Sequence, residues 1–543
     1  MERHRDGLYD RLIFRQNVLH LAPMYNQRNA LLLLCAGIAS LQMAWAQRYQ
    51  YTVDLTRLED DRFNVTLITP EITESTVVFA LPKIIPGTYA ISDYGAFATH
   101  VVAVDRKGRR LPVKQLNTNQ WEIGKAKKLY KISYEVEDIF DTDKEHHIYP
   151  MAATNIEDKN VVVHTPGIFG YMEGHNKLPI ELTFEKPSGF YGSSAKLPVE
   201  STATRDVFHM ESLDDLYDTP IMYGIPDTTT VQVGNCEVLV SVYSPNKLIQ
   251  SREIANWLTS LLHGARKYLG GKLPADRYAF LYYFKDMKIK QSFPLGLGGA
   301  LEHTMSSFYY IPEMPSDVLK NMIVDVSSHE FFHIITPLTI ASREVKEFNY
   351  DTAVLSKHLW LYEGTTEYTA HHVQVQSGIN TPEQFLDKLA AKIADSRANY
   401  DDSLAFTQLS KYAASTYADQ YGNVYQKGAL IGACLDIYLL HLSEGGYGLK
   451  DLTHDLGVRY GKDRFFEDEE LFDEIAKLSY GEARDFLVKY TQGNTPIPYE
   501  DYFDLVGIRY HPDDAKKLVI DDSASPQAKR LRAIWLTGSE PCN

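Results

Sequence analysis

The sequence predicts an α+β protein in which a β-rich first part precedes a mostly helical second part. Three observations lead to this prediction. The chain has 543 residues, which exceeds the usual size of one domain. Short runs of β-branched and aromatic residues fill the first 225 positions. From about residue 249 onward, apolar residues recur at helical spacing.

Residues 1–46 form a predicted export signal. An apolar run, ALLLLCAGIASLQMAWAQ, follows Arg28 and ends in an A-x-A pattern, which predicts cleavage before Gln47. The run is too short for a comfortable membrane span. We therefore expect an exported protein, periplasmic or secreted, with no stable membrane insertion after signal removal. A buried N-terminal helix is the alternative, and translation starts at either Met1 or Met24.

Residues 47–225 are expected to form an antiparallel β-sandwich. Its strands are the runs YQYTVDL, FNVTLIT, STVVFAL, YKISYEV and NVVVHTP, which turn clusters such as DRKGRR separate. Residues 226–505 are expected to form the mostly helical domain. There TPEQFLDKLAAKIAD opens with Thr381 followed three residues later by Gln384, the pattern of a helix capping box.

Charge and cysteine content exclude several classes of partner and site. The formal net charge of −16 would repel nucleic acids and anionic membranes, so neither is an expected partner. After signal removal three cysteines remain, an odd number without close spacing. They predict neither a disulfide framework nor a cysteine metal site.

The segment PSDVLKNMIVDVSSHEFFHIITP carries the strongest chemical signal. It is predicted as one helix, capped by Ser316 and ended by Pro337. His329 and His333 are four residues apart and share a helix face, so they can present two imidazoles to one zinc ion. Glu330 can reach a water at that ion without binding the metal. The alternative is a helix with two satisfied histidines and no metal.

A third ligand is expected from the segment KHLWLYEGTTEYTAHHVQVQSG. Glu363 can complete a site of two histidines and one glutamate whose fourth position stays open. Glu367, one turn further, either holds the outer ring nitrogen of a ligand histidine or lies in solvent. Adjacent histidines point in different directions, so four histidines are left out of the predicted site, and His303 is undecided. The four are His146, His147, His371 and His372.

These motifs resemble those of a known family. H-E-x-x-H followed by WLYEG is similar to the gluzincin metallopeptidases, whose third zinc ligand is the glutamate of W-x-x-E-G. PKIIPGTYAISDY, GGALEHTMSS and VYQKGAL resemble signatures of the glycyl aminopeptidase family, the sixty-first family of metallopeptidases. The resemblance covers about residues 49–505 and implies a β-domain before a thermolysin-like catalytic domain. Members often carry a C-terminal PDZ domain; residues 506–543 are too few for one, so we expect a short tail in which that domain is absent or truncated.

The resemblance also implies an activity: a zinc-dependent aminopeptidase that removes small N-terminal residues, Gly or Ala, from peptides. One zinc per chain would be held by His329, His333 and Glu363, with Glu330 as general base. Tyr425 is selected by the resemblance alone as a donor to the oxyanion, the alternative being a tyrosine packed at a helix start.

Glu302 is the candidate anchor for the substrate's free ammonium, since the corresponding strand glutamate has that role in related aminopeptidases. The alternative is a strand glutamate that faces solvent. Gly298 and Gly299, which lack side chains, would let a peptide backbone lie alongside as an added strand.

Three other functions stay open. The chain could be a zinc endopeptidase, another hydrolase on the same scaffold such as one that opens epoxides, or a non-catalytic exported peptide-binding protein with structural zinc. The presence of Glu330 argues against the last, because a structural site needs no base beside its ligands.

Overall fold

A seven-stranded sheet forms the larger part of the β-rich region. The computed structural model describes residues 47–289, 298–510 and 517–540, so the predicted export signal lies outside the described residues. The strand order is β13-β14-β11-β1-β2-β7-β4. In that order the strands are Glu200–Ser201, Arg205–Met210, Ile180–Glu185, Tyr49–Asp54, Arg62–Ile68, Leu129–Glu137 and Ala98–Asp105.

Two four-stranded sheets accompany the large one. One has the order β10-β3-β6-β5, and its strands are Tyr171–Met172, Thr76–Ala80, Gln120–Gly124 and Val113–Gln115. The other has the order β12-β15-β9-β8, and its strands are Tyr191–Ser193, Ile221–Gly224, Asn160–Val163 and Asn155–Ile156.

The predicted α+β class and the β-domain of antiparallel sheets are confirmed, with one difference. Strand β1 pairs with β11 in parallel, with Tyr49 opposite Ile180, whereas the other neighbours in these three sheets are antiparallel. A parallel pair needs a long crossover connection, and the many strands between β1 and β11 supply it.

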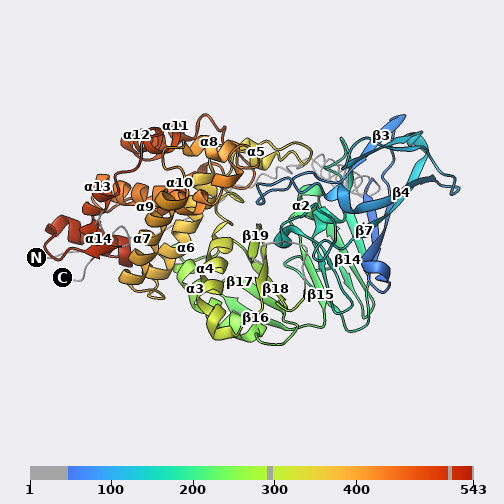
Figure 1. Cartoon of the computed structure of the whole chain (residues 1–543), viewed down its shortest axis with the longest axis horizontal. Helices are drawn as coiled ribbons and strands as arrows, with labels where there is room; N and C mark the ends of the chain where they lie inside the picture. Colours follow the sequence, from blue (N-terminus) through green and yellow to red (C-terminus); the bar gives the residue numbers. More distant parts are fainter. Residues whose placement is uncertain (1–46, 290–297, 511–516, 541–543) are drawn as a thin grey trace, which may run out of the picture. The chain divides into compact units, whose positions relative to one another are not determined.

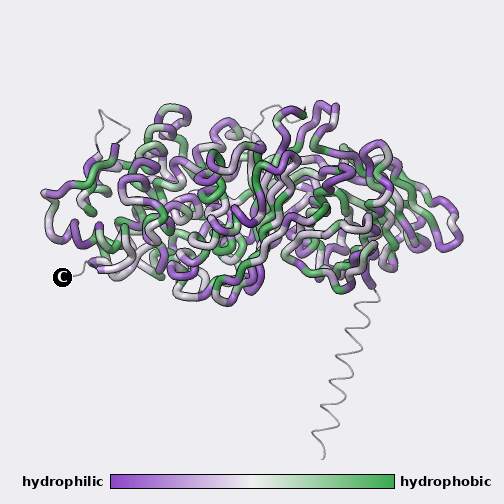
Figure 2. The backbone as a smooth tube through the Cα atoms, turned by 90° about the horizontal axis from the view of Figure 1, so that it is seen from below, coloured by the Kyte–Doolittle hydropathy of each residue, from purple (hydrophilic) through white to green (hydrophobic). Residues whose placement is uncertain are grey.

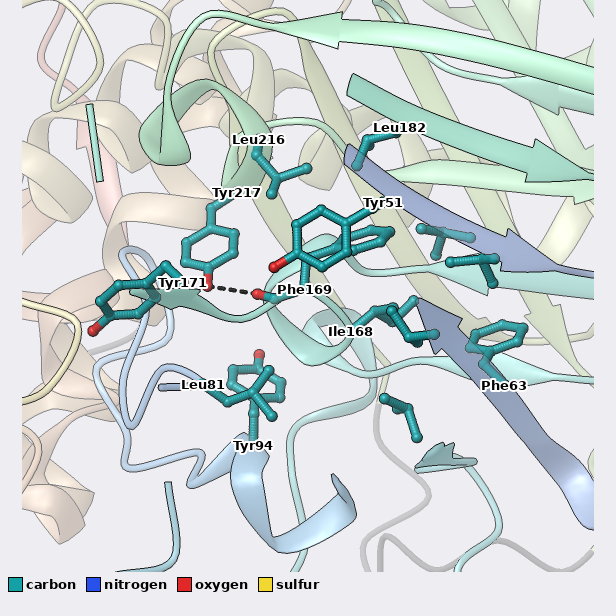
Figure 3. Close-up of a cluster of buried hydrophobic side chains, with 14 of the residues drawn as sticks. Tyr51, Phe63, Leu81, Tyr94, Ile168, Phe169, Tyr171, Leu182, Leu216 and Tyr217 are labelled. Atoms are coloured by element: carbon teal, nitrogen blue, oxygen red, sulfur yellow. Dashed lines mark hydrogen bonds between the residues drawn. The ribbon is translucent and has the colours of Figure 1, made fainter. Parts of the chain in front are cut away.

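A cluster of buried hydrophobic side chains, many of them aromatic, lies in the core of the β-domain (Figure 3). Tyr51 and Phe169 meet edge to face with ring centroids 5.0 Å apart, and the hydroxyl of Tyr217 donates to the Phe169 carbonyl at 2.7 Å. The hydroxyl of Tyr94 likewise donates to the Ala152 carbonyl. The buried phenols of Tyr217 and Tyr94 therefore each have a hydrogen-bond partner, so their rings add apolar contact without an unsatisfied donor.

The second part begins with a five-stranded mixed sheet, of order β16-β17-β18-β20-β19, not with helices alone. Its strands are Thr228–Val233, Cys236–Tyr243, Arg277–Lys285, Ser306–Pro312 and Gly299–His303. Helices α3 (Ser251–Tyr268) and α4 (Ser316–Phe332) bury apolar residues in the same core cluster as this sheet. Strand β19 is the edge strand on the α4 side, because among the described residues it pairs with β20 alone.

Helices dominate the rest of the chain, drawn in yellow to red in Figure 1. After the short helix α5 (Arg343–Lys346) come a π-helical turn, η6, and the helices α6 to α14. Hydrophobic residues recur along them while many of the connecting turns are hydrophilic (Figure 2). Their bounds are Trp360–Gly364 for η6, Thr365–Gln376, Pro382–Asn399, Phe406–Lys411, Asn423–Leu442, Leu449–Arg459, Leu471–Leu478, Gly481–Leu487, Tyr499–Asp504 and, for α14, Pro526–Thr537.

Two predicted helix starts have different outcomes. The capping box at α7 is formed: the Gln384 amide donates to the Thr381 hydroxyl at 3.2 Å and the Thr381 amide to the Gln384 side chain at 2.9 Å. At α4, Ser316 is the first helical residue and Pro315 takes the cap position. The Ser316 hydroxyl instead donates to Glu253 of α3 at 3.1 Å.

The segment predicted as a short tail, 506–543, contains structure that packs on the helices. It holds the two-stranded sheet β21 (Ile508–Tyr510) and β22 (Leu518–Ile520) and the helix α14. Trp535 of α14 is fully buried, and its indole donates to the Tyr368 hydroxyl at 2.7 Å. The Trp535 carbonyl accepts from His372 at 2.7 Å. This segment therefore braces α6.

Within the described part of the chain, no helix combines the length and the apolar character that a membrane crossing needs.

Candidate active site

Helix α4 brings its two predicted histidines to one buried point. The Nε2 atoms of His329 and His333 lie 3.0 Å apart. The Nδ1 of His333 donates to the Thr336 carbonyl at 2.9 Å, and the Nδ1 of His329 lies 2.7 Å from Glu367 Oε2. Because oxygen acceptors hold both Nδ1–H groups, both Nε2 lone pairs face the same point, as metal-binding imidazoles require.

The third predicted ligand, Glu363, completes the cluster. Its Oε2 lies 3.4 Å from His329 Nε2 and 3.6 Å from His333 Nε2, and all three residues are buried. Ligands 2.0–2.1 Å from a tetrahedral ion are roughly 3.3 Å apart, which is close to these separations. Two imidazoles and one carboxylate are also a donor set that zinc favours. The residues present therefore fit such an ion.

A contact between two glycines sets where Glu363 lies. Glu363 is in the π-helical turn η6, and π-turns are frequent at functional sites. The next residue, Gly364, lies against Gly428 of α9 so closely that a Cβ there would be 2.5 Å from the Gly428 carbonyl carbon. Only glycine permits this approach. The glycines of WLYEG and VYQKGAL thus bring η6 and α9 together.

Glu367 lies outside the cluster and holds His329, and it does not face solvent. Its carboxylate also accepts from Lys392 Nζ at 2.6 Å and from His371 Nε2 at 3.1 Å. Burial favours the protonated carboxyl, yet the charges of Lys392 and His371 and the bond to His329 overcome it, so the pKa of Glu367 is well below its usual range. Glu367 is therefore an anion at neutral pH.

Two further carboxylates face the cluster. One oxygen each of Glu330 and Glu302 lies within 4.8 Å of the other and of a ring nitrogen of His333. Burial and the like charges of Glu302 and Glu363 raise the pKa of Glu330 to about 7, although the histidines oppose this shift. Burial and the charge of Glu363 raise the pKa of Glu302 to about 8. A positive charge placed between the two carboxylates would therefore stabilise the ionised form of each.

Strand β19 presents Glu302 from the sheet edge, and the two glycines before it are not open. A Cβ on Gly299 would lie 2.8 Å from the sulfur of Met151, and one on Gly298 would lie 3.0 Å from the Tyr310 carbonyl. The β-domain and strand β20 therefore fill the space that the missing side chains free. Among the described residues no strand pairs with the other backbone edge of β19, which is the edge that an added strand would use.

Tyr425, near the start of α9, reaches the cluster from the helical side. Its ring centroid is 5.6 Å from that of His329, and its hydroxyl is 2.8 Å from the hydroxyl of Tyr421. Burial raises the pKa of Tyr425 well above its usual value, so the phenol keeps its proton. A second phenol, Tyr421, shares that proton network.

Tyr89 is a site residue that the sequence analysis missed. Its hydroxyl donates to Glu363 Oε1 at 3.0 Å from a loop of the β-domain, 274 positions away in the sequence. Its φ of 46° is uncommon for an aromatic residue, and such strained residues cluster at active sites. In the same loop, Gly87 lies against the Glu302 carboxylate. The motif PKIIPGTYAISDY that contains both residues was the available signal.

The histidines left out of the predicted site lie elsewhere. His371 is not in the cluster but contacts Glu367. His372 bonds to Tyr268 and to the Trp535 carbonyl, and His146 to the Ser92 carbonyl. His303, which was undecided, points away from Glu302 along β19, and its Nδ1 is 3.6 Å from Asp218.

A sheet-and-helix domain that carries a buried His–His–Glu cluster on two adjacent helices, behind a β-domain, defines a metallopeptidase-like class. Comparisons with known proteins give the family. The model of the Peptidase M61 N-terminal domain matches residues 50–225, and that of M61 glycyl aminopeptidase matches residues 322–431. Together the two matches span more than half of the 543 residues. The chain belongs to the M61 peptidase family, and it is a peptidase of the metallo-aminopeptidase type.

Solved structures share the fold. An aminopeptidase N family protein from Idiomarina loihiensis is 20% identical, with a TM-score of 0.74 over 85% of this chain and 78% of that one. An M1 zinc metallopeptidase from Deinococcus radiodurans, bound to a Tyr-Ser-Ala substrate, is 15% identical, with a TM-score of 0.50 over 83% and 95%. Yeast LTA4 hydrolase in complex with bestatin is 14% identical, with a TM-score of 0.50 over 83% and 68%. A comparison with curated proteins found no match.

Proposed function

We propose that the protein is a zinc-dependent aminopeptidase that removes small N-terminal residues, Gly or Ala, from peptides. The observation that carries this proposal is the buried cluster of His329, His333 and Glu363. Two further carboxylates, Glu330 and Glu302, lie beside it and are not among the proposed ligands. One zinc ion per chain would be held by the three converging side chains. When bound, it would polarise the scissile carbonyl and make the attacking water more acidic.

Glu330 is the general base of the proposed reaction. Its buried carboxylate lies beside the cluster, where a general base must both accept and release a proton. It takes a proton from the attacking water and passes it to the amine of the leaving peptide. A structural metal site would not need this buried carboxylate, whose burial is unfavourable for the charged form.

Tyr425 is the proposed donor to the oxyanion that develops on the scissile carbonyl. Its protonated phenol lies next to the His329 ring, and Tyr421 keeps it oriented through the bond between the two hydroxyls. A donor held in place before the reaction stabilises developing charge without reorganisation.

Glu302 is the proposed anchor for the substrate's N-terminal ammonium. Its raised pKa reports a buried carboxyl next to another negative charge, so an ammonium placed there would stabilise the ionised form. We expect the substrate backbone to add along the edge of β19 that no described strand pairs with, where Gly299 and the preceding Gly298 contribute backbone groups. An anchor one residue from the reaction centre restricts cleavage to the first peptide bond.

Export remains part of the proposal, because residues 1–46 have the pattern of a cleaved signal. Fractionation of cells that express the full chain, with N-terminal sequencing, tests it. Recovery of the protein in the exported fraction beginning at Gln47 is the expected result.

The activity is tested with matched peptides. Gly- and Ala-starting peptides and their N-acetylated forms are incubated with the protein, with and without a zinc chelator. We expect cleavage of the free peptides alone and its loss with the chelator. The Glu330→Gln variant should bind zinc and lose on the order of 10²–10⁴ in kcat, and Glu302→Ala should lose its preference for free amines. Equal cleavage of blocked and free peptides by the unaltered protein would instead indicate an endopeptidase. Hydrolysis that persists in the presence of the chelator would indicate another class of hydrolase.

A further inference from the structure

The metal cluster is one end of a longer ladder of paired side chains. Helix α4 carries Asp325 and His329, and His333 follows as its C-cap residue, so the three are spaced four residues apart. The turn η6 and helix α6 carry Glu363, Glu367 and His371 at the same spacing. The two series run in opposite directions and form three pairs of a histidine and a carboxylate, which we call rungs. Their separations are 3.6 Å for His333–Glu363, 2.7 Å for His329–Glu367 and 3.8 Å for Asp325–His371.

The spacing explains why the rungs form. Residues four apart on a helix lie one above another on one face, so two packed antiparallel helices repeat the same contact at each turn. Two of the three rungs contain a proposed metal ligand, and the Asp325–His371 rung extends the series one step beyond them. Every rung joins a histidine to a carboxylate.

Helix α7 places a lysine beside each of the two outer carboxylates. Lys392 Nζ is 2.6 Å from Glu367 and also donates to the Tyr425 carbonyl at 3.1 Å. Lys388 Nζ is 2.6 Å from both oxygens of Asp325 and 3.5 Å from His371 Nδ1. The lysines are themselves four residues apart. Glu367 is thus fixed from three sides, by His329, His371 and Lys392.

The outer rung differs from the inner ones in its access to solvent. Asp325 and Lys388 line a polar cavity of about 680 Å³ between α3, α4, α6 and α7, and their side chains are each 28% exposed. Gln374 also lines this cavity and donates to Asp325 at 2.9 Å. His371 is buried, so it is the connection between this surface pair and Glu367.

We propose that His371 and Asp325, with Lys388, form a positioning unit that raises the zinc affinity of the site by acting on His329 through Glu367. His371 donates to one oxygen of Glu367, which turns the other oxygen toward His329 Nδ1–H and so fixes the orientation of the ligand ring. Asp325 and Lys388 orient His371 in turn. Groups outside the ligands commonly change metal affinity on the order of 10- to 100-fold. This inference rests on the proposed zinc site.

The test measures zinc affinity of the full chain by competition with a chromophoric chelator, independently of peptidase activity. His371→Leu removes the donor and should weaken zinc binding roughly 10-fold. His371→Gln keeps a donor at the position of Nε2 and should stay within about 3-fold of the unaltered protein. Asp325→Asn should fall between them. Asp387→Asn, which removes the same charge from the wall of the same cavity, should leave zinc affinity unchanged.

A double variant separates a connected unit from independent charge effects. If Asp325 acts through His371, combining Asp325→Asn with His371→Leu should weaken zinc binding no more than His371→Leu alone. Additive losses, or wild-type affinity in His371→Leu, would overturn the proposal. Melting of the metal-free variants controls for folding, and His371→Gln serves where His371→Leu is unstable. Zinc binding without peptidase activity would leave the positioning unit intact while refuting the aminopeptidase, whereas an unaltered protein that binds no zinc would refute both.

Discussion

Replacing Gly364 by Ala tests whether the close contact between η6 and α9 positions the metal ligand beside it. Two effects oppose each other. Ala favours a helix over Gly by up to about 1 kcal/mol. The added Cβ, however, would lie 2.5 Å from the Gly428 carbonyl carbon, whereas ordinary contacts begin at 3.4 Å. The neighbour is backbone and cannot rotate away, so η6 must move by the difference of about 0.9 Å.

The relative size of the two effects decides whether the variant is more or less stable than the unaltered protein. Overpacking of a tight interior costs about 1–3 kcal/mol, which exceeds the propensity gain, so Gly364→Ala should lower the melting temperature. A shift of about 0.9 Å would also carry Glu363 with it, and misplacement on this scale can reduce turnover on the order of 10²-fold. The assay is thermal unfolding together with kcat/KM on an Ala-starting peptide.

The matched control is Gly457→Ala in the last turn of α10. There an added Cβ meets nothing nearer than an Ile340 methyl at 3.9 Å. The helix propensity gain is then unopposed, and the melting temperature should rise with unchanged activity. A Gly364→Ala protein as stable and as active as the control would refute the argument that this contact sets the position of Glu363.

Three further predictions follow from the site and its surroundings. Tyr89→Phe removes a hydrogen bond to a buried carboxylate, worth about 1.5–3 kcal/mol, so zinc affinity should fall about 10- to 100-fold; an unchanged chelator titration would exclude this role. Tyr425→Phe should lower kcat far more than it raises KM, because the phenol matters once the oxyanion forms, and a kcat near that of the unaltered protein would remove it from the mechanism. Burial lowers the pKa of His358 to about 4. As the pH falls from about 6.5 to 4, the unfolded chain therefore binds a proton at this residue that the folded chain does not bind. Up to about 3 kcal/mol of folding stability is lost over that window. His358→Gln should show a shallower loss in acid denaturation, and an equally steep one would mean that other groups control it.

Local spacing predicted the parts of the site that one helix can define. His329, His333 and Glu330 follow from a single motif, and Glu363 with Glu367 from a second, because residues four apart must share a helix face. The same rule would have connected His371 to Glu367. That contact was missed because the adjacent histidines were considered only as ligands of one ion.

Local spacing could not predict contacts between segments that are distant in the sequence. Tyr89 reaches Glu363 across 274 positions, and no periodicity in either segment encodes that meeting. The parallel pairing of β1 with β11 was missed for the same reason, since each strand alone reads as half of an antiparallel sheet. Gly299 shows a further difficulty. Its missing side chain was expected to make room for a substrate backbone, but in the structure Met151 occupies that space.

The bracing of α6 by α14 has a consequence for how the protein acquires activity during synthesis. Trp535 bonds to Tyr368 across 167 positions, so the helix that follows Glu363 lacks part of its packing until residue 535 has been made. Chains fold from the N-terminal side as they emerge from the ribosome. The β-domain and the sheet can therefore settle first, while the helix beside the metal ligands stays incomplete. A nascent chain would thus carry every proposed zinc ligand before the helix beside them is fully packed, and full packing of that helix would wait until Trp535 has been made.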